Sequence, residues 1–590
     1  KPNVTAVPGD QKVTLYWDDV AESSFDPITE TYDFEGYVIY RSTDPSFLDQ
    51  QTITDANGSK FLFEPLKTMD GASAKFDLVN DYTGLSQIPY SGRGVSYNLG
   101  NNTGLRHVFV DSNNVVNGQK YYYAVVSYDH GDAALEVAPV ECSKTITVNP
   151  ETGEILLDVN TVAVVPRTMT AGYVASSITN NEPNQVQGNG TGLINLEIID
   201  PSSIQDQNSF QIVFNEDDGL SYSVLDEKEV SDTLTARLGN YHKLSYKNID
   251  SLSFKLISSN GTLLSSGVDY DLLDKDGQIL IYADGSIVES EEITAKFIYY
   301  PIVNSKKLGS EEGNPIFDGM TLSVQNQSLA LDEQKIGWNA SSSTNWEPVV
   351  KPFNNLGGNK YPADYELRWF SDTVSSNYRP GYEYVKANFE IWETTRGYEQ
   401  KQLPFVLIES APFDSLWNPG ERIVILQDST MNSFSWELTF DTTDAPVSPS
   451  QGDIFSIFTT RSFSDDKFTF TTSSAKEDKV VEKDNMDDIY VVPNPYVVSS
   501  NIEPLDLQNP LDRGPRRVYF ANIPANCTID IYTMSGEIVK SLKHDSAIED
   551  GIKYWDLTTS DNFPVSFGMY IYHVKSEDGN ESTGRFAIIK

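Results

Sequence analysis

Short runs in which hydrophobic and polar residues alternate recur along most of the chain, and a helical period is hard to find anywhere. Such alternation is typical of strands that bury one face. Clear runs are Lys12–Trp17, Tyr37–Tyr40, Tyr121–Val126, Phe210–Phe214 and Ile529–Tyr532. Asn-Gly and Asp-Gly pairs, which tolerate the positive φ of tight turns, separate many of the runs. The pattern therefore predicts an all-β protein of serial β-sandwich domains joined by short linkers.

Breaks in this alternation divide the chain into four predicted domains: residues 1–150, 151–305, 306–485 and 486–590. The breaks fall at polar or charged segments, which suit exposed connections. These segments are Asn149–Gly153, 306–315 and 473–488. The third domain is rich in tryptophan, because it holds six of the eight in the chain: Trp338, Trp346, Trp369, Trp392, Trp417 and Trp436.

A glycine-rich stretch, Gly188–Gly192, lies in the second predicted domain. It lacks the G-x-G-x-x-G spacing of a dinucleotide-binding turn, and no helix pattern follows it. Residues 180–192 as a whole are rich in Asn, Gln, Pro and Gly. We therefore predict a flexible loop here, not a strand.

The first predicted domain carries four short motifs: Pro2–Gly9, Lys12–Trp17, Phe34–Arg41 and Val116–Val125. Together they resemble strands A, B, C and F of a fibronectin type III domain. The resemblance implies that Trp17 fills the core between two sheets. About 75 residues separate Arg41 from Val116, more than a plain module needs. We therefore expect an insertion at about 45–107, either a contact loop or a small extra sheet.

The last hundred residues carry a second set of motifs. They comprise Pro493-Asn494-Pro495, a hairpin turn at Thr533–Gly536, the strand opening Gly568-Met569-Tyr570 and the final Lys590. This set resembles the type A C-terminal sorting domain of the type IX secretion system, an Ig-like sandwich. The family usually has an acidic residue near the hairpin turn, which this chain lacks, although Ser535-Gly536 still suits a tight turn.

This resemblance implies export. It makes the type IX secretion machinery a partner and places the protein outside the cell or on its outer surface. The motif residues that carry the implication are Pro493, Asn494, Pro495, Gly536, Gly568, Tyr570 and Lys590. Fibronectin-like modules joined to such a tail also resemble the large surface proteins of Bacteroidota-type bacteria.

The net charge narrows the range of partners. The chain has 43 Lys and Arg against 85 Asp and Glu, a formal net charge of −42. Such a surface repels phosphate backbones and anionic lipid headgroups, so we expect neither nucleic-acid binding nor membrane attachment by charge. No apolar run approaches the roughly 18 residues of a membrane span, so we expect no membrane insertion.

Candidate catalytic chemistry is sparse. The five histidines lack metal-ligand spacing, and we expect each to be a surface or strand residue. Neither a G-x-S-x-G elbow nor a phosphate-binding loop is visible. The two cysteines, Cys142 and Cys527, lie in different predicted domains and are expected to be free. The sequence therefore predicts a protein without catalytic activity.

Calcium is the one cofactor that the sequence suggests. Asp271, Asp274 and Asp276 lie within seven residues that end in Gly277, and Ca²⁺ prefers clustered oxygen ligands from loops. The segment lacks the regular spacing of an EF-hand. The alternative is a β-turn with solvated carboxylates.

Tryptophans provide a candidate ligand-binding face. Trp338 and Trp346 flank a run of Ser, Asn and Thr, so they are the pair most expected to be exposed and to stack on sugar rings. Burial in the sandwich core is the alternative, and it is the expected state of the other tryptophans.

These observations leave two hypotheses for function. The first is a secreted or cell-surface structural or adhesion protein, which self-associates into a layer or filament or binds a surface glycan or protein. The second is an accessory, carbohydrate- or protein-binding region of a secreted hydrolase.

Overall fold

The computed structural model describes residues 1–149, 151–179, 182–309, 316–353, 360–377, 385–411, 413–428, 433–500, 502–503 and 516–589. Strands account for 46% of the structure and helices for 4%, which confirms the predicted all-β class and its serial sandwiches. Within the described residues the only α-helix is α1 (Lys479–Asn485), and no helix there is long and apolar enough to cross a bilayer.

The first domain is a sandwich of three strands against four. Its sheets are β1 (Val4–Gly9), β2 (Lys12–Trp17) and β9 (Val108–Asp111), facing β13 (Thr161–Val164), β10 (Tyr121–Asp129), β3 (Phe34–Ser42) and β6 (Lys75–Asp77). Trp17, Tyr37 and Tyr123 lie in the core between them. The expected boundary at 150 is too early, because β13 pairs with β10. The expected break instead falls between two strands that pair as a hairpin, β11 (Ile146–Val148) and β12 (Ile155–Leu157), and residue 150 lies outside the described residues.

The insertion in this domain forms small extra sheets. They are β4 (Ile53–Thr54) with β5 (Lys60–Leu62), and β7 (Leu85–Pro89) with β8 (Ser96–Asn98). Phe47, Tyr97 and Leu99 from this segment pack on the outer face of β3 and β10. Both faces of β10 are therefore covered, which explains why its apolar run is nearly continuous.

The second domain is built from two separate stretches of chain, which the third domain separates. One sheet runs β15 (Ser177–Ile178), β39 (Lys467–Ser473), β18 (Ser209–Asn215), β19 (Ser221–Thr235), β24 (Glu292–Ser305) and β21 (Lys255–Ile257), with β16 (Asn184–Gln187) beside β39. A second sheet pairs β17 (Leu193–Ile198) with β25 (Met320–Gln325). Phe210 stacks on Phe470 and Phe214 on Phe463 in the shared core.

The far halves of β19 and β24 extend beyond this core. There they pack with β20 (Tyr241–Lys243), β22 (Tyr270–Leu273) and β23 (Gln278–Ile281) around a smaller apolar cluster.

This arrangement corrects the expected boundary at 305/306. Strands β25 and β39 belong to the second domain, because they pair with β17 and β18. The third domain is inserted between them. The joint expected at 306–315 lies in part outside the described residues.

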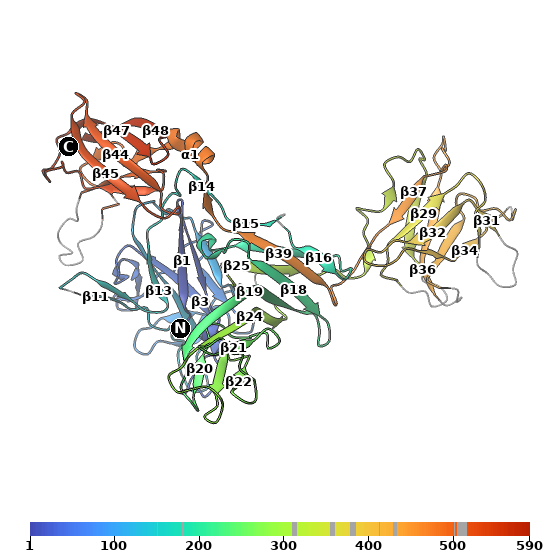
Figure 1. Ribbon diagram of the computed structural model, residues 1–590, viewed down its shortest axis with the longest axis horizontal. Coiled ribbons are helices and arrows are strands. Elements are labelled where there is room, and N and C mark those ends of the chain that lie inside the picture. The colour runs from blue at the N-terminus through green and yellow to red at the C-terminus, as the bar shows by residue number, and fades with distance from the viewer. Residues whose placement is uncertain are drawn as a thin grey trace.

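The third domain projects from one end of the molecule (Figure 1). Its sheets are β27 (Gly337–Trp338), β37 (Ile454–Ile457), β29 (Tyr365–Trp369), β32 (Phe389–Glu393) and β33 (Lys401–Leu403), facing β28 (Glu347–Pro352), β36 (Phe434–Asp441), β35 (Arg422–Leu426) and β34 (Phe405–Ile408). Short pairs β26 (Ala330–Leu331) with β38 (Thr459–Thr460), and β30 (Ser375–Ser376) with β31 (Lys386–Ala387), complete it.

The fourth domain follows a segment that we expected to be an exposed linker. That segment is structured, because β40 (Lys476–Glu477) pairs with β14 (Tyr173–Val174) and α1 comes next. The Asp478 carboxylate caps α1 by accepting hydrogen bonds from two backbone N–H groups. Glu482 in α1 is buried and accepts a 2.8 Å hydrogen bond from the Asn580 amide.

The sheets of the fourth domain hold three and five strands. They are β41 (Tyr490–Val492), β43 (Val518–Ala521) and β46 (Ile552–Trp555), facing β42 (Tyr496–Val497), β48 (Glu581–Ile589), β47 (Gly568–Ser576), β44 (Asn526–Thr533) and β45 (Ile538–Asp545). Figure 1 shows this domain beside the first domain and at the opposite end of the molecule from the third.

Candidate functional site

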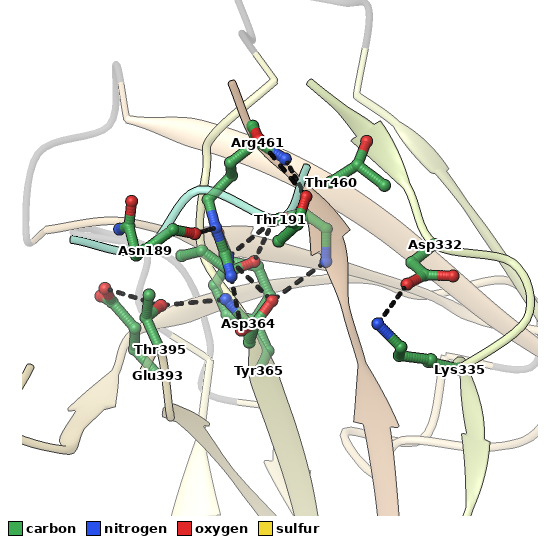
Figure 2. Close-up of polar contacts among 12 residues, drawn as sticks. Asn189, Thr191, Asp332, Lys335, Asp364, Tyr365, Glu393, Thr395, Thr460 and Arg461 are labelled. Carbon is green, nitrogen blue, oxygen red and sulfur yellow. Dashed lines mark hydrogen bonds and ion pairs between the residues drawn. The ribbon is translucent and has the colours of Figure 1, made fainter. Parts of the chain in front are cut away.

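The most elaborate polar cluster in the described residues lies where the second domain meets the third (Figure 2). Arg461 follows β38 as the chain returns from the third domain toward β39. Its side chain reaches Asp364, just before β29, and its backbone meets the 188–192 stretch of the second domain. We call the group Arg461, Asp364, Asn189 and Thr191 the Arg461 joint.

The third-domain half of the joint is a buried ion pair. The two terminal nitrogens of Arg461 each lie 2.9 Å from one carboxylate oxygen of Asp364. The exposed side-chain fractions are 7% and 9%, so water does not screen the pair. Asp364 Oδ1 also accepts a 3.0 Å hydrogen bond from the Thr459 N–H. A bidentate pair of this kind fixes the plane of the guanidinium as well as its position.

The second-domain half uses the remaining donors of the same residue. Arg461 Nε donates to the Asn189 carbonyl at 2.8 Å. The Arg461 N–H donates to Thr191 Oγ1 at 2.7 Å, and the Thr191 N–H donates to the Arg461 carbonyl at 3.0 Å. One arginine is therefore bonded to both domains at once.

The stretch that receives Arg461 is firmly packed, so the prediction of a flexible loop at Gly188–Gly192 is wrong. Residues just before it form β16, which pairs with β39. The buried Asp466 carboxylate accepts hydrogen bonds from the Gly190 N–H at 2.9 Å and from Gln185 Nε2 at 2.7 Å. A Cβ at Gly190 would lie only 2.5 Å from the Phe463 ring. Glycine is thus required here by close approach, not by mobility.

A second contact between domains joins the first to the fourth. The Asn117-Gly118 turn lies against the sheet of β43 and β46, where Tyr519 donates to the Asn117 carbonyl and Tyr554 to the Gly118 carbonyl, each at 3.1 Å. Gly118 has φ +81°, and a Cβ on it would lie 2.6 Å from the Tyr519 ring. We call these four residues the Asn117–Gly118 contact.

Backbone hydrogen bonds extend this contact along the chain that leaves β13. The Gly551 N–H donates to the Thr168 carbonyl at 2.9 Å, and the Ala171 N–H donates to the Ile523 carbonyl at 3.2 Å. Arg167 and Asp550 add a partly exposed ion pair at 3.1 Å.

The candidate calcium residues do not form a binding group. Asp271 lies in β22, while Asp274 and Asp276 lie in the turn that leads to β23. The Asp274 carboxylate accepts from the N–H of Lys275, the next residue. In the part of the chain that the structure describes, no three His, Cys, Asp or Glu side chains gather in a way that could hold a metal ion. These residues belong to one hairpin, with Asp271 in its first strand and Asp274 and Asp276 in its turn.

The expectation that Trp338 and Trp346 form an exposed stacking face is wrong. Trp346 is 7% exposed, and Trp338 packs 5.0 Å from the ring of Trp369. Trp338 Nε1 donates a 3.0 Å hydrogen bond to the Trp346 carbonyl, so the indole N–H of Trp338 is satisfied within the domain. The physical reason is that Trp338 lies in β27, an edge strand whose side chain at that position points into the core.

The motif residues of the fourth domain lie around β48 and β47. Pro493, Asn494 and Pro495 connect β41 to β42, and Asn494 Oδ1 accepts a 3.1 Å hydrogen bond from the Ala587 N–H of β48. Gly568 opens β47, and the buried Tyr570 donates to the Ser566 carbonyl at 2.6 Å.

Gly536, with φ +87°, forms the turn between β44 and β45. Lys590 lies outside the described residues.

Histidines and cysteines take structural places. His107 is buried, contrary to expectation, with Nε2 2.6 Å from Glu22 Oε1. Burial opposes the charge of Glu22, but His107, the charge of Lys307 and the Tyr37 hydroxyl together outweigh burial and lower the pKa of Glu22. Cys142 and Cys527 are free, and burial raises the pKa of the Cys527 thiol to about 12, which makes it unreactive.

Comparisons with known proteins give only remote similarities. No family model matches the chain, and no curated protein matches it. PorZ, an essential bacterial surface component of the type-IX secretion system of Porphyromonas gingivalis, is 13% identical, with 100% of this chain and 82% of that chain covered at a TM-score of 0.17.

Two further structures are similar at the same level. Dimeric latent PorU from Porphyromonas gingivalis is 11% identical, covering 78% of this chain and 36% of that chain at a TM-score of 0.12. A tetra-tandem repeat from the extending region of a large adhesion protein is 10% identical, covering 100% of both chains at a TM-score of 0.10. At such scores the overlaps define no shared arrangement of domains, and the fibronectin and sorting-domain assignments stay predictions.

Proposed function

We propose that this chain is a secreted or cell-surface protein with a structural or adhesive role and no catalytic activity. The observation that carries the proposal is the Arg461 joint. A domain that only needs tethering is served by one flexible linker. Here the third domain is connected by two crossings of the chain, and a buried ion pair sets its direction. Such a construction suits a protein that must hold a domain at a fixed distance and angle.

The proposal includes export by a type IX-like system, read from the fourth domain. The sequence motifs at Pro493-Asn494-Pro495, Gly536 and Gly568–Tyr570 support this part. The net charge of −42 is compatible with an extracellular location.

The export part is tested in a bacterium that has a type IX system. The tagged full chain is produced in the parent strain and in a strain without the translocon, and its position is determined by fractionation and surface labelling. We expect the chain outside the parent cells and inside the mutant cells. Equal export from both strains would refute a type IX route.

The structural role is tested on the purified chain by electron microscopy. We expect particles in which the third domain keeps one angle to the rest, either alone or within regular polymers. A wide range of angles would contradict the proposal. Turnover of polysaccharides or proteins in a substrate screen would favour an accessory region of a hydrolase instead.

A further inference from the structure

Two acidic residues from distant parts of the second domain face each other in its interior. Asp226 lies in β19 opposite Tyr299 of β24, at a bulge where the pairing register shifts. Asp318 lies in the turn before β25, with the unusual φ of +43°. Asn208 lies directly before β18, and its side chain stands beside Asp226.

Three polar atoms of this group lack the hydrogen-bond partners that buried atoms normally have. Asn208 is 2% exposed, and neither its amide oxygen nor its amide nitrogen has a hydrogen-bond partner. Asp318 Oδ2 is likewise buried without a partner. Asp226 is 3% exposed, and its Oδ1 accepts one hydrogen bond, from the Lys228 N–H at 2.9 Å. Unsatisfied buried polar atoms are rare, and an unplaced ion is one of the causes.

Charging both carboxylates of the group at once is unfavourable. Burial and the neighbouring charge of Asp226 raise the pKa of Asp318 to about 6, despite the lowering effects of Lys228 and the Tyr299 hydroxyl. Burial also raises the pKa of Asp226. A buried carboxylate and a half-buried one in contact need either a shared proton or a cation between them.

We propose that Asp226, Asp318 and Asn208 bind a divalent cation of the calcium type, with both carboxylates and the Asn208 amide oxygen as ligands. Ca²⁺ takes six to eight oxygen ligands, and water completes a shell that protein groups leave open. Side-chain amides can present their oxygen to such an ion by a half-turn of the amide group. The proposal does not depend on the proposed function.

The ion would connect three segments of the second domain that are far apart in the sequence. Asn208 precedes β18, Asp226 lies at the bulge of β19, and Asp318 precedes β25, the strand from which the chain leaves for the third domain. A cation at this place would therefore stabilise the second domain and the base of the third domain's connection.

The test uses the full chain, freed of metal with a chelator and kept in 0.15 M KCl, so that weak binding to exposed carboxylates is screened. Calcium chloride is titrated by calorimetry, and the melting temperature is measured with and without 1 mM Ca²⁺. We compare the natural chain with Asp318→Asn, and with Asp271→Asn as the matched control from the exposed hairpin.

For the natural chain and Asp271→Asn we expect one bound Ca²⁺ and a rise in melting temperature of roughly 2–8 °C. Asp318→Asn should bind at least about tenfold more weakly. Equal binding by Asp318→Asn, or no binding by the natural chain, would overturn the proposal. A gain in stability of Asp318→Asn at neutral pH, with no calcium response in the natural chain, would identify a shared proton instead.

A second variant covers the case in which circular dichroism shows that Asp318→Asn does not fold. Asn208→Ala removes a neutral ligand and should also weaken calcium binding. If Asn208→Ala binds as tightly as the natural chain, the assignment of Asn208 as a ligand fails and the proposed site with it.

Discussion

The Arg461 joint and the Asn117–Gly118 contact solve the same problem, that of fixing one domain on another, with opposite chemistry. The joint concentrates its specificity in one charged side chain whose donors reach both domains. The contact spreads it over tyrosine hydroxyls, backbone carbonyls and a turn that fits closely against an aromatic ring. The first arrangement depends on a single residue, while the second depends on a surface.

The difference predicts how each connection fails. A buried ion pair is costly to form, because both charges lose their hydration, and removing one partner leaves the other charge buried alone. Neutral hydrogen bonds to backbone carbonyls contribute about 1 kcal/mol each, so no single one of them is decisive. A substitution that alters the shape of the Asn117–Gly118 contact should therefore destabilise it more than the loss of any one hydrogen bond.

The largest expected effect comes from Arg461→Ala. Asp364 would remain buried without a partner, and we expect a loss of about 3–5 kcal/mol in the free energy of unfolding of the adjoining domains. Denaturant unfolding followed by tryptophan fluorescence measures it, because four buried tryptophans lie in the third domain. Lys306→Ala, which breaks the exposed pair with Asp218, is the control and should leave the midpoint unchanged.

The double variant Arg461→Met, Asp364→Leu separates stability from orientation. An apolar pair of similar volume often restores the stability that a broken ion pair loses. We expect near-natural stability together with a broader range of third-domain angles in small-angle scattering. A double variant that is stable and still holds one angle would show that the ion pair does not set the direction.

Gly118→Ala tests the shape of the Asn117–Gly118 contact and should cost about 2–4 kcal/mol, from backbone strain and from overlap with Tyr519. Gly58 provides a matched control, because it also follows an asparagine, has the same φ of +81° and has no atom within 4 Å of an added Cβ. Gly58→Ala should cost only the strain, about 1 kcal/mol. Equal losses in the two variants would mean that Tyr519 yields without cost.

The smallest expected effect is a pH dependence that acts on one connection only. His544, next to the first–fourth contact, bonds to the Asp550 carbonyl at 2.9 Å. Burial lowers the pKa of His544 below its ordinary 6.5. The folded state therefore binds this proton less well than the unfolded state, so stability is fully present above pH 6.5 and declines as the pH falls below it.

Melting curves of the natural chain and of His544→Asn between pH 8 and pH 5.5 measure this dependence. The variant should lose part of the decline that the natural chain shows. The Arg461 joint has no group that titrates in this range by its ordinary pKa, so the third domain should melt at a constant temperature. A parallel decline in both domains would place the titrating group elsewhere.

Alternation of residue types predicted the class of the fold but not the partners of its strands. The pattern at Lys12–Trp17 or Phe210–Phe214 shows which face is buried. It does not show that β18 pairs with β39, because a strand's alternation is the same whichever strand lies beside it. The boundary expected at 305/306 and the end of the third domain expected at 485 were therefore wrong, because the chain leaves the second domain after β25 and returns to it at β39.

The residues of the two proposed sites could not be found in the sequence for a related reason. Arg461 and Asp364 are 97 residues apart, and neither stands in a local motif. Asp226 and Asp318 are equally ordinary in their own segments. The run of aspartates at Asp271–Asp276 is a pattern typical of a turn as well as of a calcium loop, and here it belongs to a hairpin. The polar residues beside Trp338 in the sequence suggested that its side chain is exposed. Polar residues also flank a core residue when its strand lies at the edge of a sheet.

The insertion of the third domain also sets an order of assembly. Strand β18 needs β39 on one side and β19 on the other, so a chain that emerges from its amino end holds an incomplete second domain until residue 473 is free. The third domain is contiguous, and all its strands are present before then. The third domain can therefore fold first. Its folding brings together the two chain segments that connect it to the second domain, and so places β39 beside the incomplete sheet of that domain. Folding of the third domain therefore precedes, and makes possible, the completion of the second domain.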